Sequence, residues 1–550
     1  MGFDGLYMRR VIEEIKRNVK GHLKNIYQYT KVDYFLVFNE GSVRVSLNPN
    51  LSFIALMEKY DIPARMPSSF TMLLRKHIKS ARFLGIDQEG FSRIAKFKFE
   101  KRNELGDLVK YTLYVETMGK FSNMILVDQN GKIIDAHKRI ITAYRELLPG
   151  KKFTPYSSNK KDPFEVDIKE IDFRGGSRMA LVKHIEGISP LIENEIYHRA
   201  GINEGKIDIQ SLKRAWEEFL KEYEEGFTYL LKTHGKPKDV AVIKITHIDY
   251  THERMPPSEA IKNLVLFKES SEKLEAKRKN LEKIVKREIK KLEDITEKLL
   301  KELKETEKTK DYKKYGELLK AYFYQIPHNL TKVELYDWQE DKMVLVPLSR
   351  SSSPLELSQM YFEKYKKLKR KKERVEKRLK EIESSISYLE NVLQFLQDAE
   401  SIEDLEEIEK ELEDFGILKK RKRKTREAEK SKPRKVKYKD ALILIGKNNK
   451  QNDKLVREAS PNDLWLHAHE IPGAHVIVKT DSGKVGSEVI EYAASLAAGY
   501  SRGKNSGKVP VDYTHVKYIK KPKGAKPGFV IYKNYKTIFV KPRRISDTGM

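Results

Sequence analysis

Residues 368–396 read LKRKKERVEKRLKEIESSISYLENVLQFL, a stretch in which apolar side chains recur at the spacing of a coiled-coil seam. The apolar positions are separated first by seven residues and then alternately by four and three, so they share one face of a helix. Because such a face must be buried against another element, the stretch also predicts a partner helix. The positions are Leu368, Val375, Leu379, Ile382, Ile386, Leu389, Leu393 and Leu396.

A charged segment from Leu266 to about Lys308 predicts that partner helix. Residues 325–347 lie between the two runs, lack helical periodicity and contain Trp338 and the strand-like Met343–Val346. We therefore expect an antiparallel arm of about 60 Å, at roughly 1.5 Å per residue, that carries a small tip domain. An intermolecular coiled coil has the same heptads, although we prefer a monomer. The apolar positions of the first run are Leu281, Val285, Ile289, Leu292, Ile295, Leu299 and Leu303.

The segment that precedes the first run predicts an α+β domain followed by a helix-hairpin-helix. An amphipathic helix is expected around Met8 to Leu23, and Gly175 to Arg178 mark a boundary. Met179–Ile185 and Leu191–Ala200 then predict short helices joined by Gly187-Ile188-Ser189-Pro190, a turn that suits phosphate binding or is an ordinary helical turn. Strands are expected at Tyr34–Phe38, Val43–Leu47, Tyr111–Val115 and Asn123–Val127, with a hairpin at Asn130-Gly131.

The segment that follows the second run predicts a linker and a compact α+β domain. Lys419 to Lys437 contain twelve Lys or Arg against two Glu and should form a mobile basic linker, either a solvated tether or an RNA contact. One helix is expected at Gly486–Ser501. Strands are expected at Ala441–Ile445, Ala474–Val478, Val516–Ile519, Phe529–Tyr532 and Thr537–Val540.

The composition restricts the classes of function. The 550 residues carry 109 Lys and Arg against 81 Asp and Glu, and a net charge of +28 favours a nucleic-acid partner. The chain has no cysteine, which excludes disulfides, thiolate nucleophiles and cysteine-ligated metals. It has no long apolar run and no hydrophobic leader, so we expect a soluble, cytoplasmic protein without a membrane partner.

Polar side chains that could carry chemistry concentrate near the C-terminal end. His467, His469 and His475 lie close to Trp465, and this set suits RNA contact, core packing or, less well, a metal ion. The segment from Gly446 to Asp453 offers donors for phosphate and ribose in Lys447, Asn448, Asn449, Lys450 and Asn452. Walker, dinucleotide-binding and zinc-protease motifs are absent from the sequence.

Several of these motifs resemble the NFACT family, which includes RqcH, NEMF and FbpA, with bacterial RqcH the most similar kind. The resemblance covers essentially the whole chain. Phe3-Asp4-Gly5, Leu73–Ile78, Arg102–Asp107 and Tyr114–Asn123 resemble the NFACT-N domain, and Gly446–Asp453, Asp463–Val476, Val509–Thr514 and Lys521–Gly528 resemble the NFACT-R domain.

The resemblance implies a ribosome-associated quality control factor that is not an enzyme. Such proteins bind a large ribosomal subunit, with its rRNA, that is obstructed by peptidyl-tRNA, and they recruit tRNA, in bacteria alanyl-tRNA, for template-free alanine tailing. No cofactor, metal or catalytic residue is implied. The tRNA contacts carried over are Asp4, Ser92 and Arg93, where Ser92 replaces the Asp of the family's Asp-Arg pair.

The expected fold class is α+β multidomain. The predicted division is 1–174 NFACT-N domain, 175–262 helix-hairpin-helix region, 263–308 first coiled coil, 309–354 middle tip domain, 355–418 second coiled coil with an adjoining helix, 419–438 basic linker and 439–550 NFACT-R domain.

Two other functions are weighed against this one. The N-terminal half also resembles DNA glycosylases of the formamidopyrimidine type, but those use an N-terminal proline and an adjacent glutamate, whereas this chain begins Met1-Gly2-Phe3-Asp4. Some relatives are called fibronectin-binding proteins, which suggests a surface adhesin. The missing secretory signal argues against that role.

Overall fold

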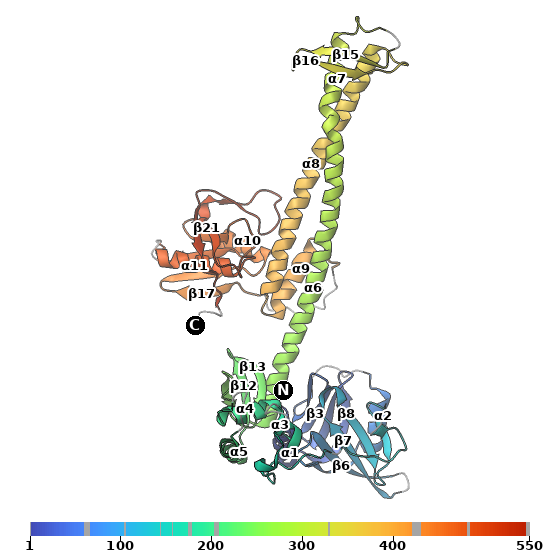
Figure 1. Cartoon of the computed structure of the whole chain (residues 1–550), viewed down its shortest axis with the longest axis vertical. Helices are drawn as coiled ribbons and strands as arrows, with labels where there is room; N and C mark the ends of the chain where they lie inside the picture. The colour runs from blue at the N-terminus through green and yellow to red at the C-terminus, as the bar shows by residue number, and fades with distance from the viewer. Residues whose placement is uncertain are drawn as a thin grey trace. The chain divides into compact units, whose positions relative to one another are not determined.

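The structure is a computed structural model that divides into two compact units, Met1–Ser271 and Glu272–Met550 (Figure 1). Each unit is described by itself. The residues that the structure describes are 2–59, 66–103, 106–142, 145–156, 158–173, 179–202, 208–327, 330–420, 431–480 and 485–545.

A long antiparallel sheet forms the centre of the first unit, in the order β4-β3-β2-β1-β5-β6-β7-β8-β9. The predicted strands and the Asn130-Gly131 hairpin are confirmed. Helices α1 (Gly5–Asn18) and α2 (Ser69–Ile78) pack against the sheet. The strands are β1 (Lys20–Gln28), β2 (Asp33–Glu40), β3 (Ser42–Asn48), β4 (Leu51–Leu56), β5 (Arg82–Gln88), β6 (Ile94–Arg102), β7 (Leu108–Glu116), β8 (Asn123–Asp128) and β9 (Ile133–Ala136), with the short pair β10 (Ile140–Ile141) and β11 (Glu146–Leu147).

The first helix is shorter than predicted. It ends at Asn18, and Leu23 belongs to strand β1. The physical reason is Gly21, which has a φ of +85° that a right-handed helix cannot contain. The spacing of Val19 and Leu23 suits a helix, but pairing with β2 determines the local structure.

The helix-hairpin-helix is present as α3 (Ala180–His184) and α4 (Pro190–Arg199). Its turn residue Gly187 has a φ of +80°, and an added Cβ would lie 2.9 Å from the Cβ of Phe91. The predicted boundary at 175–178 lies outside the described residues. The sequence analysis missed α5 (Ile209–Glu224) and the sheet β13-β12-β14, formed by β12 (Tyr229–Thr233), β13 (Lys236–Ala241) and β14 (Thr251–Arg254).

Both heptad runs form helices where the sequence predicts them. These are α6 (Pro257–Glu305), of which the part after Ser271 belongs to the second unit, and α8 (Pro354–Asp398). Leu281 of α6 packs in one cluster with Leu389 of α8, and Lys371 pairs with Glu302 at 3.4 Å, so the helices run antiparallel in one chain (Figure 1). Supercoiling of this pair and a separate tip domain remain predictions.

The seam of α8 is buried with the predicted period of seven. Val375, Ile382, Leu389 and Leu396 are buried, whereas Leu368 and the intervening apolar positions are half-buried. In the sequence, α6 is followed by α7 (Thr309–Ala321) and by the hairpin of β15 (Lys332–Asp337) and β16 (Lys342–Pro347). Helix α9 (Ile402–Asp414) follows α8.

The C-terminal part of the chain forms a sheet in the order β17-β18-β20-β19-β21-β24, together with helices α10 (Asn449–Glu458) and α11 (Ser487–Gly499). The predicted strand at Val516–Ile519 is wrong, because Val516–Tyr518 form a 3-10 turn after β21, which the sequence analysis missed. Residues 421–430 of the predicted linker lie outside the described residues, and its end is already strand β17. The strands are β17 (Arg434–Tyr438), β18 (Ala441–Ile445), β19 (Leu464–Ala468), β20 (Val476–Thr480), β21 (Val509–His515) and β24 (Lys536–Val540), with the short pair β22 (Ile519–Lys520) and β23 (Ile531–Tyr532).

Candidate nucleic-acid interface

Asp4 connects the first helix to the hairpin turn. Its Oδ1 accepts a hydrogen bond from the backbone N–H of Tyr7 at 2.9 Å, which caps α1, and its Oδ2 accepts one from the Oγ of Ser189 at 2.7 Å. The carboxyl group is buried, and this burial raises its pKa to about 6 although both hydrogen bonds favour the ionised form. The start of α1 and the start of α4 are therefore held together by one partly protonated carboxyl group.

The loop before Arg93 packs against the same corner. An added Cβ on Gly5 would lie 1.6 Å from the carbonyl oxygen of Phe91, so glycine is required for this close approach. The Nε2 of Gln88 donates to the carbonyl oxygens of Gly5, at 2.8 Å, and Ser92, at 2.7 Å. These contacts fix the position from which the side chain of Arg93 projects.

Arg93 presents an exposed guanidinium at this corner. Among the residues that the structure describes, none forms a hydrogen bond or an ion pair with this guanidinium. Partial desolvation lowers its pKa and the charge of Asp4 acts in the opposite direction, so it remains cationic at neutral pH. Two of the positions carried over as tRNA contacts, Asp4 and Arg93, thus lie within electrostatic range of each other, and the described residues leave Arg93 available for an anion such as a phosphate.

The side chain of Ser92 has a local partner. Its Oγ donates to the carbonyl oxygen of Glu89 at 2.7 Å, which closes the turn before Arg93. Burial and, to a smaller extent, the nearby charge of Arg93 lower the pKa of Lys160, which the sequence analysis missed. The Nζ of Lys160 donates to the carbonyl oxygen of Val182 at 2.7 Å. No local pattern in the sequence indicates Lys160, because the chain brings it to Arg93 from 67 positions away.

The predicted RNA-contacting segment after Gly446 is instead engaged with α9. Asn448 caps α10, and Asn448, Asn449 and Asn452 are buried, so the prediction that these amides face RNA is wrong. The amides satisfy buried acceptors, as buried polar groups must. The contacts to one face of α9 are Lys447 to Asp404 at 3.0 Å, Asn448 to Glu407 at 2.8 Å, Asn449 to Glu411 at 3.0 Å, Gln451 to Glu407 at 2.8 Å, and Lys450 to Asp414.

Trp465 and His475 also belong to the core. Trp465 is fully buried and His475 nearly so, which corrects the prediction that they contact RNA. The His475 ring stands edge-on to Trp465 at 5.3 Å between centroids, and the half-exposed His467 lies parallel to Trp465 at 5.7 Å. Burial lowers the pKa of His467 to about 4 and that of His475 well below its ordinary value, so both imidazoles are neutral at physiological pH.

His469 has a different environment. Its Nδ1 lies 2.7 Å from the Oδ2 of Asp512, and this hydrogen bond raises the pKa of His469. Asp512 is fully buried and also accepts hydrogen bonds from Tyr532 and Thr537, each at 2.7 Å. A search of the described residues for three His, Asp or Glu side chains that could share a metal ion finds no such group.

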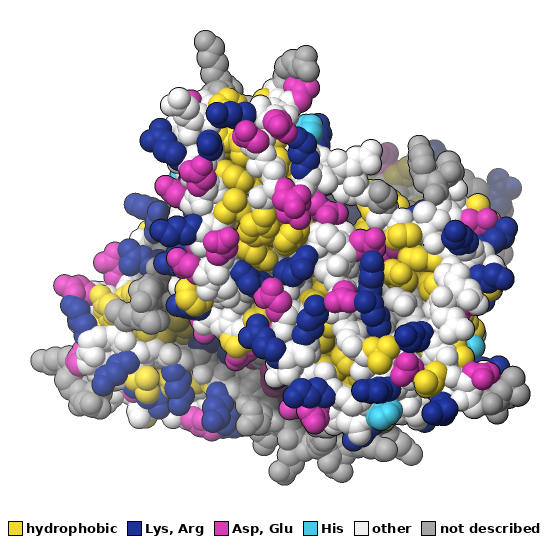
Figure 2. Space-filling model, turned by 90° about the horizontal axis from the view of Figure 1, so that it is seen from below, with side chains coloured by type: hydrophobic (Ala, Val, Ile, Leu, Met, Phe, Trp, Pro, Cys, Tyr) yellow, Lys and Arg dark blue, Asp and Glu magenta, His cyan; other side chains and the backbone are white. Residues whose placement is uncertain are grey.

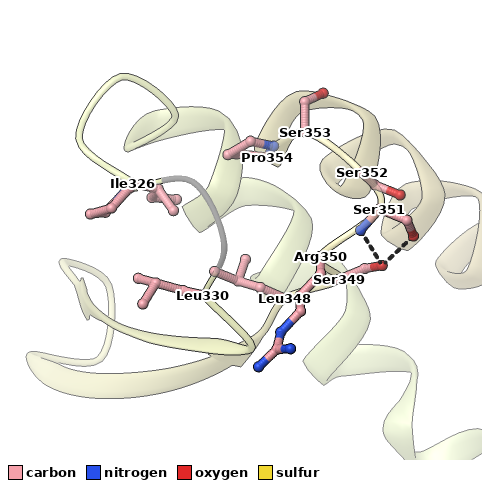
Figure 3. A pocket seen from close by; sticks show the side chains of 10 residues that line it. Ile326, Leu330, Leu348, Ser349, Arg350, Ser351, Ser352, Ser353 and Pro354 are labelled. Atoms are coloured by element: carbon pink, nitrogen blue, oxygen red, sulfur yellow. Dashed lines mark hydrogen bonds between the residues drawn. The ribbon is translucent and has the colours of Figure 1, made fainter.

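A pocket of about 220 Å³ lies beside the start of α8 (Figure 3). Ile326, Leu330 and Leu348 supply an apolar side, and the loop Ser349–Ser353 supplies hydroxyl groups. Arg350 is the one ionisable side chain among the described residues that line it.

The charge of the chain is not gathered into one patch on the face that Figure 2 shows. Lys and Arg side chains are spread there among Asp and Glu side chains. Throughout the described ranges, no helix is both long and apolar enough to cross a membrane.

The chain contains a helix-hairpin-helix, a guanidinium that no described residue pairs with, and a lysine-rich α+β domain. These are features of a multidomain nucleic-acid-binding protein. The chain belongs to the NFACT family: residues 4–432 match NFACT N-terminal and middle domains, and residues 434–534 match the NFACT protein RNA binding domain.

The chain is also similar to individual known proteins. It is 33% identical to the Rqc2 homolog RqcH of Bacillus subtilis, over 98% of both chains. It is 27% identical to the human ribosome quality control complex subunit NEMF over 24% of this chain and 12% of that protein. Among solved structures, the C-terminal part of the fibronectin/fibrinogen-binding protein of Streptococcus suis is 33% identical, with a TM-score of 0.41, over 50% of this chain and 98% of that one.

The raised pKa of Asp4 predicts a pH-dependent stability. Because the folded-state pKa of about 6 lies above the ordinary 3.8, protonation stabilises the fold at acidic pH, and this contribution is lost as the pH rises through about 6. Asp4→Asn keeps an acceptor for the N–H of Tyr7 and offers an amide donor to the Oγ of Ser189, without the charge. Relative to Asp4→Asn, the wild-type free energy of unfolding should fall by on the order of 2 kcal/mol between pH 4.5 and 7.5. Urea unfolding of both proteins checks this, and parallel pH profiles would contradict it.

Proposed function

We propose that the chain is a ribosome-associated quality control factor that binds large ribosomal subunits obstructed by peptidyl-tRNA. The observation that carries the proposal is the similarity to the Rqc2 homolog RqcH, which extends over 98% of both chains. The match to the NFACT N-terminal and middle domains, followed by the match to the RNA binding domain, supports an RNA partner, and so does the net charge of +28.

We further propose that the N-terminal unit holds a tRNA, alanyl-tRNA in the first instance, for template-free alanine tailing. The exposed guanidinium of Arg93 lies beside the hairpin turn at Gly187, where the start of α4 offers backbone N–H groups to a phosphate. Ser92 lacks the carboxylate of the family's Asp-Arg pair. In this chain the carboxylate that acts on Arg93 is Asp4.

The proposed role is binding and positioning without catalysis. Arg93 supplies a fixed charge, and Asp4 is occupied by the cap of α1 and by Ser189, so neither side chain is arranged as a nucleophile with its base. Formation of the peptide bond is then left to the ribosome.

The association with obstructed subunits is tested by sedimentation. After translation is stalled in a cell extract, the full chain should migrate with large subunits that retain peptidyl-tRNA, and puromycin, which removes the nascent chain, should release it. Immunoblotting of gradient fractions measures the distribution. Migration in ribosome-free fractions both before and after stalling would contradict the proposed function.

The tRNA contact is tested by Arg93→Gln. Loss of one charge-assisted phosphate contact should weaken binding of tRNA-Ala by about tenfold and reduce the slope of log K against log salt by about 0.9. Filter binding over a range of salt concentrations measures both quantities.

Lys110→Gln is the matched control for Arg93→Gln. Lys110 is an exposed cation on β7, the strand that pairs with β6, and it lies six residues, roughly 20 Å, from Glu116, which pairs with the start of β6 next to Arg93. It should leave both quantities nearly unchanged. Equal losses in the two variants would show that Arg93 contributes net charge and no defined contact.

A further inference from the structure

The C-terminal sheet has one face that is covered along its whole width and one that is not. Helix α11 packs on the covered face, and Val509 and Val511 of β21 point to it together with their β24 partners Val540 and Ile538. Side chains alternate along a strand, so the pairs Pro510–Phe539 and Asp512–Thr537 lie on the opposite face.

The opposite face is covered only in part by the described residues. Leu455 of α10 packs with Trp465 and Ile477 over β19 and β20, and the ring of Tyr532 lies 4.8 Å from that of Trp465. Over β24 the cover ends: Phe539 is 67% exposed and Tyr535 is 46% exposed. An aromatic surface is therefore left open at the edge of the sheet.

Asp512 fixes the side chains around this surface. It pairs with His467 on β19 and with Thr537 on β24, so these residues form one row across the sheet. The N–H of His469 donates to the carbonyl oxygen of Pro510 at 2.9 Å, which places His469, Pro510 and Phe539 in the next row. Asp512 also accepts hydrogen bonds from the side chains of His469, Tyr532 and Thr537, which orients these three side chains beside the surface.

Cations outnumber acids around this surface. Residues 505–545 contain eleven Lys or Arg and one acidic residue, Asp512, whose oxygens already accept hydrogen bonds, while Glu470 is an exposed acidic neighbour of His469. Lys508 and Lys541 flank one end of the β21–β24 ladder, at positions that alternate in step with Pro510 and Phe539, and both are exposed. Within the described part of the chain these lysines form no ion pair, so they remain available to a polyanion.

We propose that the open face of β21 and β24 is a stacking platform for unpaired RNA nucleotides, with Phe539 and Tyr535 against bases and the flanking lysines on phosphates. The proposal rests on the proposed RNA-binding function and specifies the form of RNA that this domain takes. Exposed rings favour single strands, because a duplex hides its base faces and presents phosphates and 2′-hydroxyl groups. An apolar protein partner would not require the surrounding cations.

The test measures binding of the full chain to a twelve-nucleotide single-stranded RNA and to the duplex of the same sequence. Wild type should prefer the single strand. Phe539→Ala should weaken single-strand binding by about tenfold, Phe539→Tyr should restore it and Phe539→Leu should not, because stacking requires an aromatic ring. Lys508→Gln combined with Lys541→Gln should reduce the salt slope by about 1.4, whereas Phe539→Ala should leave that slope unchanged.

Phe121→Ala is the matched control. Phe121 is 64% exposed and has Lys120 Nζ 5.0 Å from its ring centre, yet it lies in the other unit. Circular dichroism checks that each variant is folded. We expect the Phe539 variants to fold, because the side chain of Phe539 is exposed and contributes little to the core. Equal losses for Phe121→Ala and Phe539→Ala, full affinity of Phe539→Leu, or a preference for the duplex would overturn the proposal.

The sedimentation experiment separates this proposal from the proposed function. If these binding tests fail while wild type still migrates with large subunits, the proposed function stands. If wild type does not migrate with large subunits, the proposed function itself is contradicted.

Discussion

Hydrogen bonds to two buried carboxyl groups fix the local structure of the two surfaces that are proposed to bind RNA. Asp4 ties the first turn of α1 to the hairpin at Ser189, and Asp512 ties His469, Tyr532 and Thr537 to the C-terminal sheet. In each case donors from the protein satisfy the oxygens of the carboxyl group, so the group serves to fix the local structure.

The donor segment after Gly446 illustrates the opposite case. Lys447 and Lys450 look free in the sequence, but α9 presents Asp404, Glu407, Glu411 and Asp414 at helical spacing and pairs with them and with the neighbouring amides. This network is part of a packed core that also contains Leu405 and Ile443. Its buried amides therefore stabilise the fold and do not face solvent.

Elements with a local signal in the sequence are predicted correctly. Features that depend on a partner far away in the sequence are not. The heptads of α8 and the Asn130-Gly131 hairpin carry their own periodicity or turn chemistry, so both are found where they are expected. Alternation along β19 indicates that Trp465 and His467 share a face but cannot reveal that α10 covers Trp465. The family resemblance names Asp4 and Arg93 as tRNA contacts without stating that they are neighbours, and the exposed Phe539 follows from neither periodicity nor resemblance, because burial depends on the whole sheet.

The central claim is that RNA contacts the Arg93 corner and the β21–β24 face and not the segment after Gly446. Ultraviolet crosslinking of the full chain to obstructed large subunits and tRNA, followed by mass spectrometry of the RNA-bound peptides, tests it most directly. The account predicts crosslinked peptides that contain Arg93 and peptides that contain Tyr535 or Phe539. Crosslinks at residues 446–453 or Trp465, with none at those two surfaces, would contradict it.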